Sequence, residues 1–303
     1  MRSREHTTKV LVAYDGSPSA DEAIEDLQRA GIANAEFLVI SVAEHWLQEV
    51  PGNGTTGDGR RSKQGLAEAT TFVKHAAERI RALFPEWKVD SKAVSGSPAL
   101  EILTEAERFK PDLIVVGSQG RTALGRLILG SISQKVLSEA SCSVRIGRVF
   151  EASPGKSVIV IAFDGSQGSH TAVKTVAERC WEEPCEIHLV AACEELVPTA
   201  IGRFIPPIVD WVKEEVRLER VIMRKLADAA FETLKSAGCA VALEVRNGNP
   251  KQVVIEEASR VGADCIFIGA NASAVKLGRF LIGSTSAAVA ARADCPVEVV
   301  RRR

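Results

Sequence analysis

The residues best suited to chemistry in this chain are glycines and serines with the spacing of an anion-binding site. Gly117 and Gly120 are followed, after nine residues, by Gly130 and Ser131, which gives the pattern G-x-x-G-x(9)-G-S. Glycine lets backbone amides approach a ligand with no Cβ in the way. A helix N-terminus adds unpaired N–H groups and a partial positive charge, which together favour phosphate. The alternative is structural, since Gly117 can simply end a strand, Gly130 form a turn and Ser131 cap a helix.

A second polar segment supports the ligand-binding interpretation. Asp15-Gly-Ser17-Pro18 follows the apolar run 10–14, just as Gly117 follows the apolar run 113–116. Short apolar runs are typical of buried strands, and Ser followed by Pro is a good start for a helix. In parallel sheets, ligands bind beyond the carboxyl ends of the strands. We therefore expect Asp15 to lie near the glycines, where the whole pattern favours a nucleotide, although Asp15 can also cap its own turn.

The elements that position these segments alternate between strands and helices. Such alternation predicts parallel strands joined by right-handed crossovers. The expected fold class is α/β, with an open, doubly wound (Rossmann-like) sheet of five mostly parallel strands and helices on both faces. The expected strands are 10–14, 37–42, 89–94, 113–116 and 143–146, and the expected helices are 19–30, 66–84, 98–108 and 131–140.

The chain contains this unit twice. Segments of the first half recur in the same order in the second half, which indicates a tandem duplication. The matching pairs are 10–17 (VLVAYDGS) with 159–166 (IVIAFDGS), 112–117 (DLIVVG) with 264–269 (DCIFIG), and Gly130-Ser131 with Gly283-Ser284. The length of 303 residues suits two domains, which we place at 1–149 and 156–303 with a short turn-like linker between them.

Composition excludes several classes of protein. Lys and Arg number 38 against 39 Asp and Glu, a balance that argues against binding nucleic acid through its phosphate backbone. The apolar runs are too short for a membrane span, and the charged N-terminal residues lack the apolar core of a signal peptide. Seven cysteines with no C-x-x-C predict neither a disulfide framework nor a zinc ribbon. We expect buried, reduced thiols in a cytoplasmic protein.

Three motifs resemble those of the universal stress protein family, and the resemblance covers essentially the whole chain as a tandem member. They are VLVAYDGS at 10–17, V-x-G-S-P at 94–98 and G-S-Q-G-R-x(8)-G-S-I-S at 117–133. The last motif is similar to the ATP-binding signature of the nucleotide-binding branch. The resemblance implies an ATP-binding, stress-response protein whose nucleotide is held mainly by the first domain.

The resemblance also implies a role for individual positions. The adenine would lie near the end of the first strand and pack on Val42. The ribose and phosphates would lie along the segment after the fourth strand and at the following helix N-terminus. The implied ligand-binding residues are Ala13, Tyr14, Asp15, Val42, Val116, Gly117, Gln119, Gly120, Gly130, Ser131, Ile132 and Ser133. Mg²⁺ or Mn²⁺ would be held mostly by phosphate oxygens and water, so no protein ligand for a metal is assigned.

The second copy departs from this pattern. Gly269 is kept, but the second glycine falls on Ala272 or Ser273, and the interval to Gly283 is one residue longer. A Cβ and an additional loop residue would displace the amides of the anion-binding segment. We therefore predict that the second copy binds nucleotide weakly or not at all.

The segments before the long helices also differ between the copies. Residues 45–65 are rich in glycine but lack the G-K-[ST] of a P-loop. Residues 196–213 are more apolar, which leaves open whether they pack over their own sheet edge or form a partner surface.

No catalytic residue is assigned, because the sequence has neither a Walker lysine nor a recognisable nucleophile–base set. The first hypothesis is a nucleotide-binding regulatory protein, with at most weak ATP hydrolysis. The alternatives are a nucleotide-independent interaction scaffold and a slow ATPase or adenylyl-transfer enzyme. In the family, domains pair through their last strands, here 143–147 and 296–300, so the resemblance implies intramolecular pairing of the two domains and leaves room for a homodimer.

Overall fold

A computed structural model of the chain describes residues 7–44, 58–120, 129–148, 155–193, 206–270 and 282–302. The described residues form two compact units, one on each side of the predicted linker. The domain boundaries at 149 and 156 stay a prediction, because most of the residues between them lie outside the described ranges.

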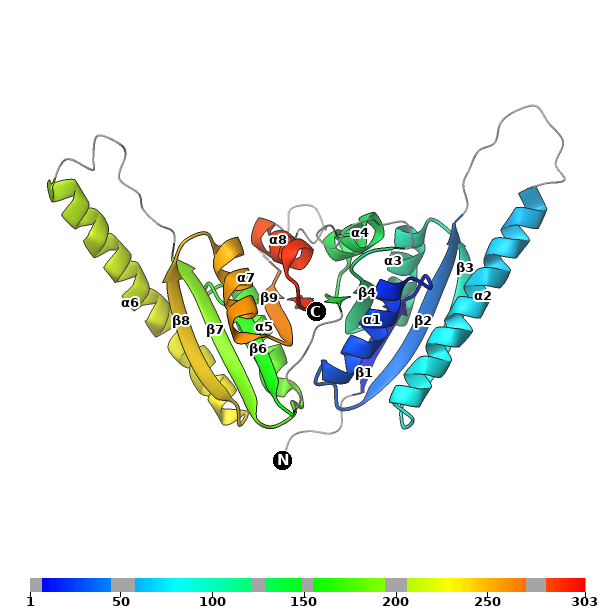
Figure 1. The fold of residues 1–303 in the computed structure, drawn as a ribbon, viewed down its shortest axis with the longest axis horizontal. Coiled ribbons are helices and arrows are strands. Elements are labelled where there is room, and N and C mark those ends of the chain that lie inside the picture. The colour runs from blue at the N-terminus through cyan, green and yellow to red at the C-terminus, as the bar shows by residue number, and fades with distance from the viewer. Residues whose placement is uncertain are drawn as a thin grey trace, which may run out of the picture. The chain divides into compact units, whose positions relative to one another are not determined.

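The first unit is an open parallel sheet (Figure 1). Its strands lie in the order β3-β2-β1-β4-β5, and every neighbouring pair is parallel. The chain builds outward from β1 to β3 and then returns to place β4 on the other side of β1, which makes the sheet doubly wound. The elements are β1 (Thr8–Ala13), α1 (Pro18–Asp26), a 3₁₀ turn (Leu27–Arg29), β2 (Ala35–Glu44), α2 (Asp58–Leu83), β3 (Lys88–Gly96), α3 (Pro98–Phe109), β4 (Leu113–Gly117), α4 (Ser131–Glu139) and β5 (Ser143–Gly147).

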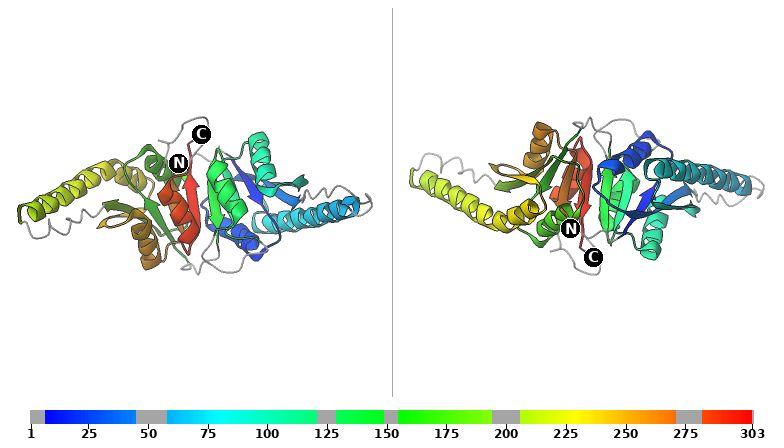
Figure 2. Two further views of the ribbon diagram at one scale, coloured as in Figure 1. Left: turned by 90° about the horizontal axis from the view of Figure 1, so that it is seen from above. Right: turned by 90° about the horizontal axis from the view of Figure 1, so that it is seen from below.

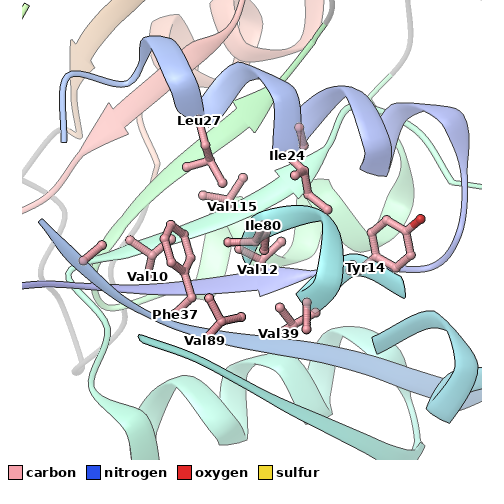
Figure 3. Close-up of a cluster of buried hydrophobic side chains, with 14 of the residues drawn as sticks. Val10, Val12, Tyr14, Ile24, Leu27, Phe37, Val39, Ile80, Val89 and Val115 are labelled. Carbon is pink, nitrogen blue, oxygen red and sulfur yellow. The ribbon is translucent and has the colours of Figure 1, made fainter. Parts of the chain in front are cut away.

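Helices cover both faces of this sheet. In both views of Figure 2, α1 and α2 lie on one side of the strands and α3 lies on the other. Alternate residues of β1 point toward α1 and α2, where Val10, Val12 and Tyr14 pack with Phe37 and Ile80 (Figure 3). Strands buried on both faces explain the near-continuous apolar runs in the sequence.

The second unit repeats this architecture. Its strands lie in the order β8-β7-β6-β9-β10, again with every neighbouring pair parallel. The α/β class and the doubly wound topology predicted for both copies are therefore confirmed. The elements are β6 (Ser157–Ala162), α5 (Gln167–Glu178), β7 (Cys185–Cys193), α6 (Pro206–Ser236), β8 (Ala240–Asn247), α7 (Pro250–Val261), β9 (Cys265–Gly269), α8 (Ser284–Arg292) and β10 (Val297–Val300).

The two long helices begin earlier than the sequence suggested. The predicted helix 66–84 starts at Asp58, because residues 58–65 carry no apolar side chain and so show no helical periodicity. Part of the segment 196–213, expected between a strand and a helix, is helical from Pro206 onward. Proline is well suited to the first turn of a helix. Residues 45–57 and 194–205 lie outside the described ranges.

A repeated aspartate has a structural role in each unit. The backbone N–H of Lys9 donates to Oδ2 of Asp112 over 2.8 Å. In the same way, the N–H of Val158 donates to Oδ2 of Asp264 over 2.7 Å. Each aspartate therefore ties the start of its unit's first strand to the start of its fourth, which accounts for this part of the sequence repeat.

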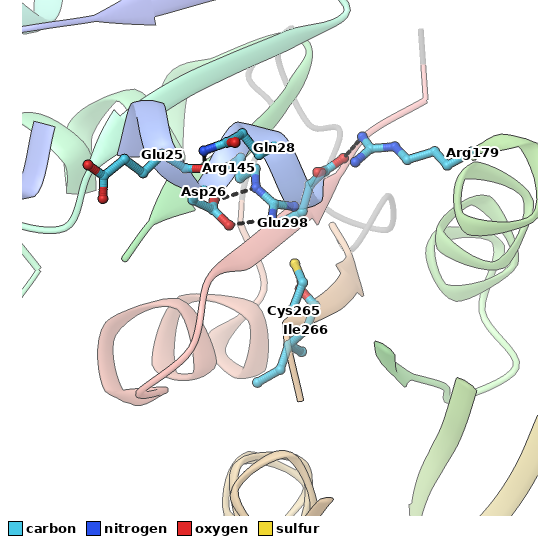
Figure 4. A network of polar contacts seen from close by, with 8 residues as sticks. All are labelled: Glu25, Asp26, Gln28, Arg145, Arg179, Cys265, Ile266 and Glu298. Atoms are coloured by element: carbon cyan, nitrogen blue, oxygen red, sulfur yellow. Dashed lines mark hydrogen bonds and ion pairs between the residues drawn. The ribbon is translucent and has the colours of Figure 1, made fainter. Parts of the chain in front are cut away.

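The last strand of each unit carries a buried charged side chain that forms an ion pair (Figure 4). In β5, the Arg145 guanidinium donates to both carboxylate oxygens of Asp26, over 2.6 and 2.7 Å. In β10, the matching position is Glu298, which accepts from Arg179. The charge at this position is thus reversed between the copies, and each unit supplies its own opposite charge.

One cysteine is not buried. Cys180 is exposed in the turn after α5, whereas the other six cysteines are buried as expected. Among the described residues, no helix combines the length and the apolar character that crossing a membrane requires.

Candidate functional site

Asp15 follows β1 and shapes the turn into α1. Its Oδ1 accepts from the backbone N–H of Ser17 over 3.0 Å. Between them Gly16 has φ +76°, and a Cβ there would lie 2.6 Å from the ring of Phe72. The other carboxylate oxygen, Oδ2, lies 3.4 Å from where a Cβ would stand at Gly120. Asp15 therefore caps its turn and also lies beside the predicted phosphate-binding segment.

The glycine segment after β4 is brought against the start of α4. The N–H of Gly130 donates to the carbonyl of Ser118 over 2.8 Å. A Cβ at Gly130 would lie 3.4 Å from Cα of Gln119 and 3.5 Å from the backbone nitrogen of Gly120. A Cβ at Gly117 would lie 2.8 Å from the backbone oxygen of Ser19, so this position needs glycine. Residues 121–128 of the same motif lie outside the described ranges.

The N-terminus of α4 presents backbone amides rather than a capping side chain. Its N-cap is Gly130, which has no side chain to accept from the first-turn amides. Ser131 is exposed, Ile132 is half-buried, and Ser133 is buried. The Ser133 hydroxyl donates to the carbonyl of Gly117 over 2.7 Å, so its proton ties α4 to the end of β4. The structure thus leaves the first-turn backbone of α4 without a capping side chain at Gly130, with Ser131 exposed beside it.

The predicted adenine-binding residues divide into two groups. Tyr14 points into the core, where its hydroxyl donates to Asp21 over 2.9 Å and its ring packs edge-on against Phe72. Burial, together with this hydrogen bond, raises the pKa of Tyr14 well above its ordinary value. Only the backbone of Tyr14 is therefore placed for a ligand. Ala13 and Val42 are half-buried at or near the carboxyl ends of β1 and β2, while Val116 is buried in β4.

The second unit keeps part of this arrangement. Oδ1 of Asp164 accepts from the N–H of Ser166 over 2.9 Å, as Asp15 does in the first unit. The Ser286 hydroxyl donates to the carbonyl of Gly269 over 2.9 Å, as Ser133 does to Gly117. The altered glycine pattern falls on residues 271–281, which lie outside the described ranges.

Sequence reasoning missed Ser19, which contacts the backbone of Gln119 from the first turn of α1. Position 19 lies outside the recognised motifs, so the only signal was the comparison of the two copies, where Gly168 replaces it.

The arrangement in the first unit suits an anionic ligand that also carries hydroxyl or amine donors. Glycine backbone and a helix N-terminus favour phosphate, and the Asp15 carboxylate can accept from a sugar hydroxyl or a base amine. Within the described residues, no three His, Cys, Asp or Glu side chains gather to hold a metal ion.

The comparisons with known proteins show the family of the chain. The model of the universal stress protein family matches residues 6–148 and again residues 157–301. The chain belongs to the universal stress protein family. Two matches in tandem confirm that it is a two-copy member.

Relatives of two lengths support this assignment. A universal stress protein of Mycolicibacterium smegmatis is 30% identical over 305 residues, which covers 97% of each chain. One from Methanocaldococcus jannaschii is 37% identical over 141 residues, covering 46% of this chain and 80% of the relative.

A solved structure that spans both copies supports the fold. The crystal structure of a universal stress protein from Archaeoglobus fulgidus has a TM-score of 0.66 and 21% identity, and the match covers 97% of this chain and 96% of that one. A family member from Arabidopsis thaliana, solved with AMP bound, is 21% identical over 45% of this chain and 88% of its own, with a TM-score of 0.33.

Proposed function

We propose that this universal stress protein is an adenine-nucleotide-binding regulatory protein of the stress response, and that its first unit holds ATP. The observation that carries the proposal is the convergence of three segments distant in sequence. The Asp15 carboxylate lies beside Gly120, and Gly130 at the start of α4 lies against Gln119 and Gly120. A hydrogen-bond acceptor, a glycine backbone and a helix N-terminus thus lie together where the neighbouring strands β1 and β4 end.

The choice of an adenine nucleotide rests on the motif and on family membership. The chain carries the complete G-x-x-G-x(9)-G-S pattern in its first copy. A family member has been solved with AMP bound. Mg²⁺ or Mn²⁺ would accompany the triphosphate and be held mainly by its oxygens and by water.

The remaining parts of the proposal concern the cellular location and the partners of the protein. We place the protein in the cytoplasm, without nucleic acid as a partner. Pairing of the two domains through their last strands, and of two chains in a homodimer, stays a prediction.

The direct test is to denature freshly purified protein and to identify the released small molecules by chromatography. We expect an adenine nucleotide in the native chain. We expect none in Gly120→Val, because its side chain would enter the space beside Asp15. The matched control is Gly65→Ala, whose Cβ would make an ordinary 3.5 Å contact with Ala43, and it should retain the nucleotide.

Two outcomes would redirect the assignment. A native chain that releases no nucleotide and binds none when ATP and Mg²⁺ are added would support a nucleotide-independent scaffold. Steady ATP turnover that is lost in Asp15→Ala would instead make the protein an ATP-consuming enzyme.

A further inference from the structure

Ser19, in the first turn of α1, makes two hydrogen bonds to the backbone of a single residue. The N–H of Gln119 donates to the Ser19 hydroxyl oxygen over 3.3 Å. The same hydroxyl donates its proton to the Gln119 carbonyl. A side chain on one helix thus contacts both backbone polar atoms of Gln119, which lies within the glycine segment after β4.

A neighbouring serine performs the ordinary capping role. The Ser17 hydroxyl accepts from the N–H of Ala20 over 3.2 Å and so caps α1. It also lies 3.3 Å from the Ser19 hydroxyl and 3.5 Å from the Gln119 carbonyl. Because Ser17 already caps the helix, the bonds of Ser19 to Gln119 are not needed to begin α1.

The orientation of the Gln119 carbonyl sets the direction of the next amide. A peptide bond is planar and trans, so the N–H of Gly120 points opposite to the carbonyl of Gln119. Since Ser19 holds that carbonyl toward α1, the Gly120 amide is directed away from α1. Its nitrogen lies 3.5 Å from where a Cβ would stand at Gly130, the N-cap of α4.

The matching position of the second unit cannot make this contact. The position of Ser19 is occupied by Gly168, which has no hydroxyl. A Cβ at Gly168 would lie 2.5 Å from the backbone oxygen of Ala270, so the helix backbone approaches the end of β9 directly. The hydroxyl contact is therefore specific to the copy that keeps the complete glycine pattern.

We propose that Ser19 is a positioning residue for the phosphates of the bound nucleotide. By holding the Gln119 carbonyl, it aims the Gly120 amide at the phosphate that the N-terminus of α4 attracts. This inference rests on the proposed function, and it assigns to Ser19 a contribution to phosphate binding rather than to adenosine binding.

The test compares ATP with adenosine on the full chain, by calorimetric titration after bound nucleotide has been removed. Ser19→Ala should weaken ATP binding about tenfold, the order expected for losing one or two hydrogen bonds. Adenosine affinity should stay unchanged, and Ser19→Thr, which keeps the hydroxyl, should restore ATP binding. The matched control is Ser138→Ala on α4, which removes a hydroxyl bonded to the Gln134 carbonyl over 2.8 Å and should change neither affinity.

The outcomes separate this inference from the function on which it rests. If the native chain binds ATP and Ser19→Ala binds it equally well, the inference is wrong and the function stands. If ATP and adenosine weaken by the same factor in Ser19→Ala, Ser19 is only structural and the inference is again wrong. If the native chain binds neither ligand, the proposed function is wrong and the inference falls with it.

Discussion

The strand-end segments of the two units share their framework but differ where a ligand would lie. Both units keep the aspartate that accepts from the N–H two residues later, over 3.0 Å at Asp15 and 2.9 Å at Asp164. Both also keep a helix serine that donates to the glycine carbonyl at the end of the fourth strand. Ser19 of the first unit is Gly168 in the second. The two units thus share the contacts that shape their strand ends, whereas the hydroxyl contact of Ser19 with Gln119 is one that Gly168 cannot make.

The two units also differ in the buried ion pair that each contains. Arg145 and Glu298 occupy matching positions in the last strands, and each is paired within its own unit. A sequence segment exchanged between the copies would bring the wrong charge to a buried site. The two units have therefore diverged in their internal pairing as well as at the strand ends.

The largest predicted effect concerns this buried pair. Asp26→Ala removes the carboxylate that accepts two hydrogen bonds from the buried Arg145. We expect the free energy of unfolding of the first unit to fall by about 3–5 kcal/mol, because removing one partner of a buried, doubly hydrogen-bonded ion pair is strongly destabilising. Urea denaturation followed by tryptophan fluorescence measures this change, and Trp87 reports on the first unit.

The matched control for Asp26→Ala lies one residue earlier. Glu25 is exposed on the same helix and pairs with Arg79. Glu25→Ala should cost less than about 1 kcal/mol, as exposed ion pairs do. Equal effects of the two substitutions would show that the buried pair does not stabilise the unit as described.

The next largest predicted effect on stability comes from comparing alanine substitutions at matching positions in the first turns of α1 and α5. Gly168→Ala places a Cβ 2.5 Å from the Ala270 carbonyl oxygen, a backbone atom that cannot simply rotate away. We expect a loss of about 1–3 kcal/mol from this overpacking. Ser19→Ala should stay within about 1 kcal/mol of the native chain, because it loses hydrogen bonds but gains helix propensity. Thermal unfolding of both variants tests the contrast, and a neutral Gly168→Ala would contradict the close approach of α5 to β9.

The smallest effect is a pH dependence in the second unit. The bidentate hydrogen bonds from Arg260 lower the pKa of the buried Glu257 below its ordinary value. A carboxylate whose pKa is lowered by folding stabilises the protein above its unfolded pKa, and this stabilisation is lost as the pH falls through the folded pKa. Glu257→Gln should therefore destabilise the chain at neutral pH, and the difference from the native chain should shrink as the pH falls below the ordinary range of glutamate pKa values.

The control for this pH dependence is Glu256→Gln. Glu256 is the neighbouring residue on α7 and forms a more exposed pair with Arg246. Its substitution should change the free energy of unfolding by less than about 1 kcal/mol, because exposed ion pairs contribute little. A difference between Glu257→Gln and the native chain that is the same at neutral and at acidic pH would contradict the assigned cause of the lowered pKa.

Much of the fold was predictable from the sequence, because strands buried on both faces give uninterrupted apolar runs and the repeat places each of them twice. The helix start at Asp58 was not, since the polar residues 58–65 carry no apolar period. The start at Pro206 was not either, because the apolar residues of 196–213 were equally compatible with a segment over the sheet edge or a partner surface. Cys180 was expected to be buried, but the turn after α5 exposes it.

The candidate site was predictable to a lesser degree. Glycine spacing indicated that the segments after β4 and before α4 belong together, and the structure places them in contact. It gave no indication that the Tyr14 side chain turns into the core or that the Ser133 hydroxyl bonds the Gly117 carbonyl. Those outcomes depend on which face of a strand or helix a side chain occupies relative to its neighbours, and motif spacing does not contain that information.

The most direct test of the account is the number of ATP molecules bound per chain. Calorimetric titration of the nucleotide-free chain with ATP and Mg²⁺ should give one site per chain. That site should be lost in Gly130→Val at the N-cap of α4 and kept in Gly283→Val at the N-cap of α8. Two equivalent sites per chain, or no site at all, would contradict the central claim that nucleotide binding belongs to the first unit.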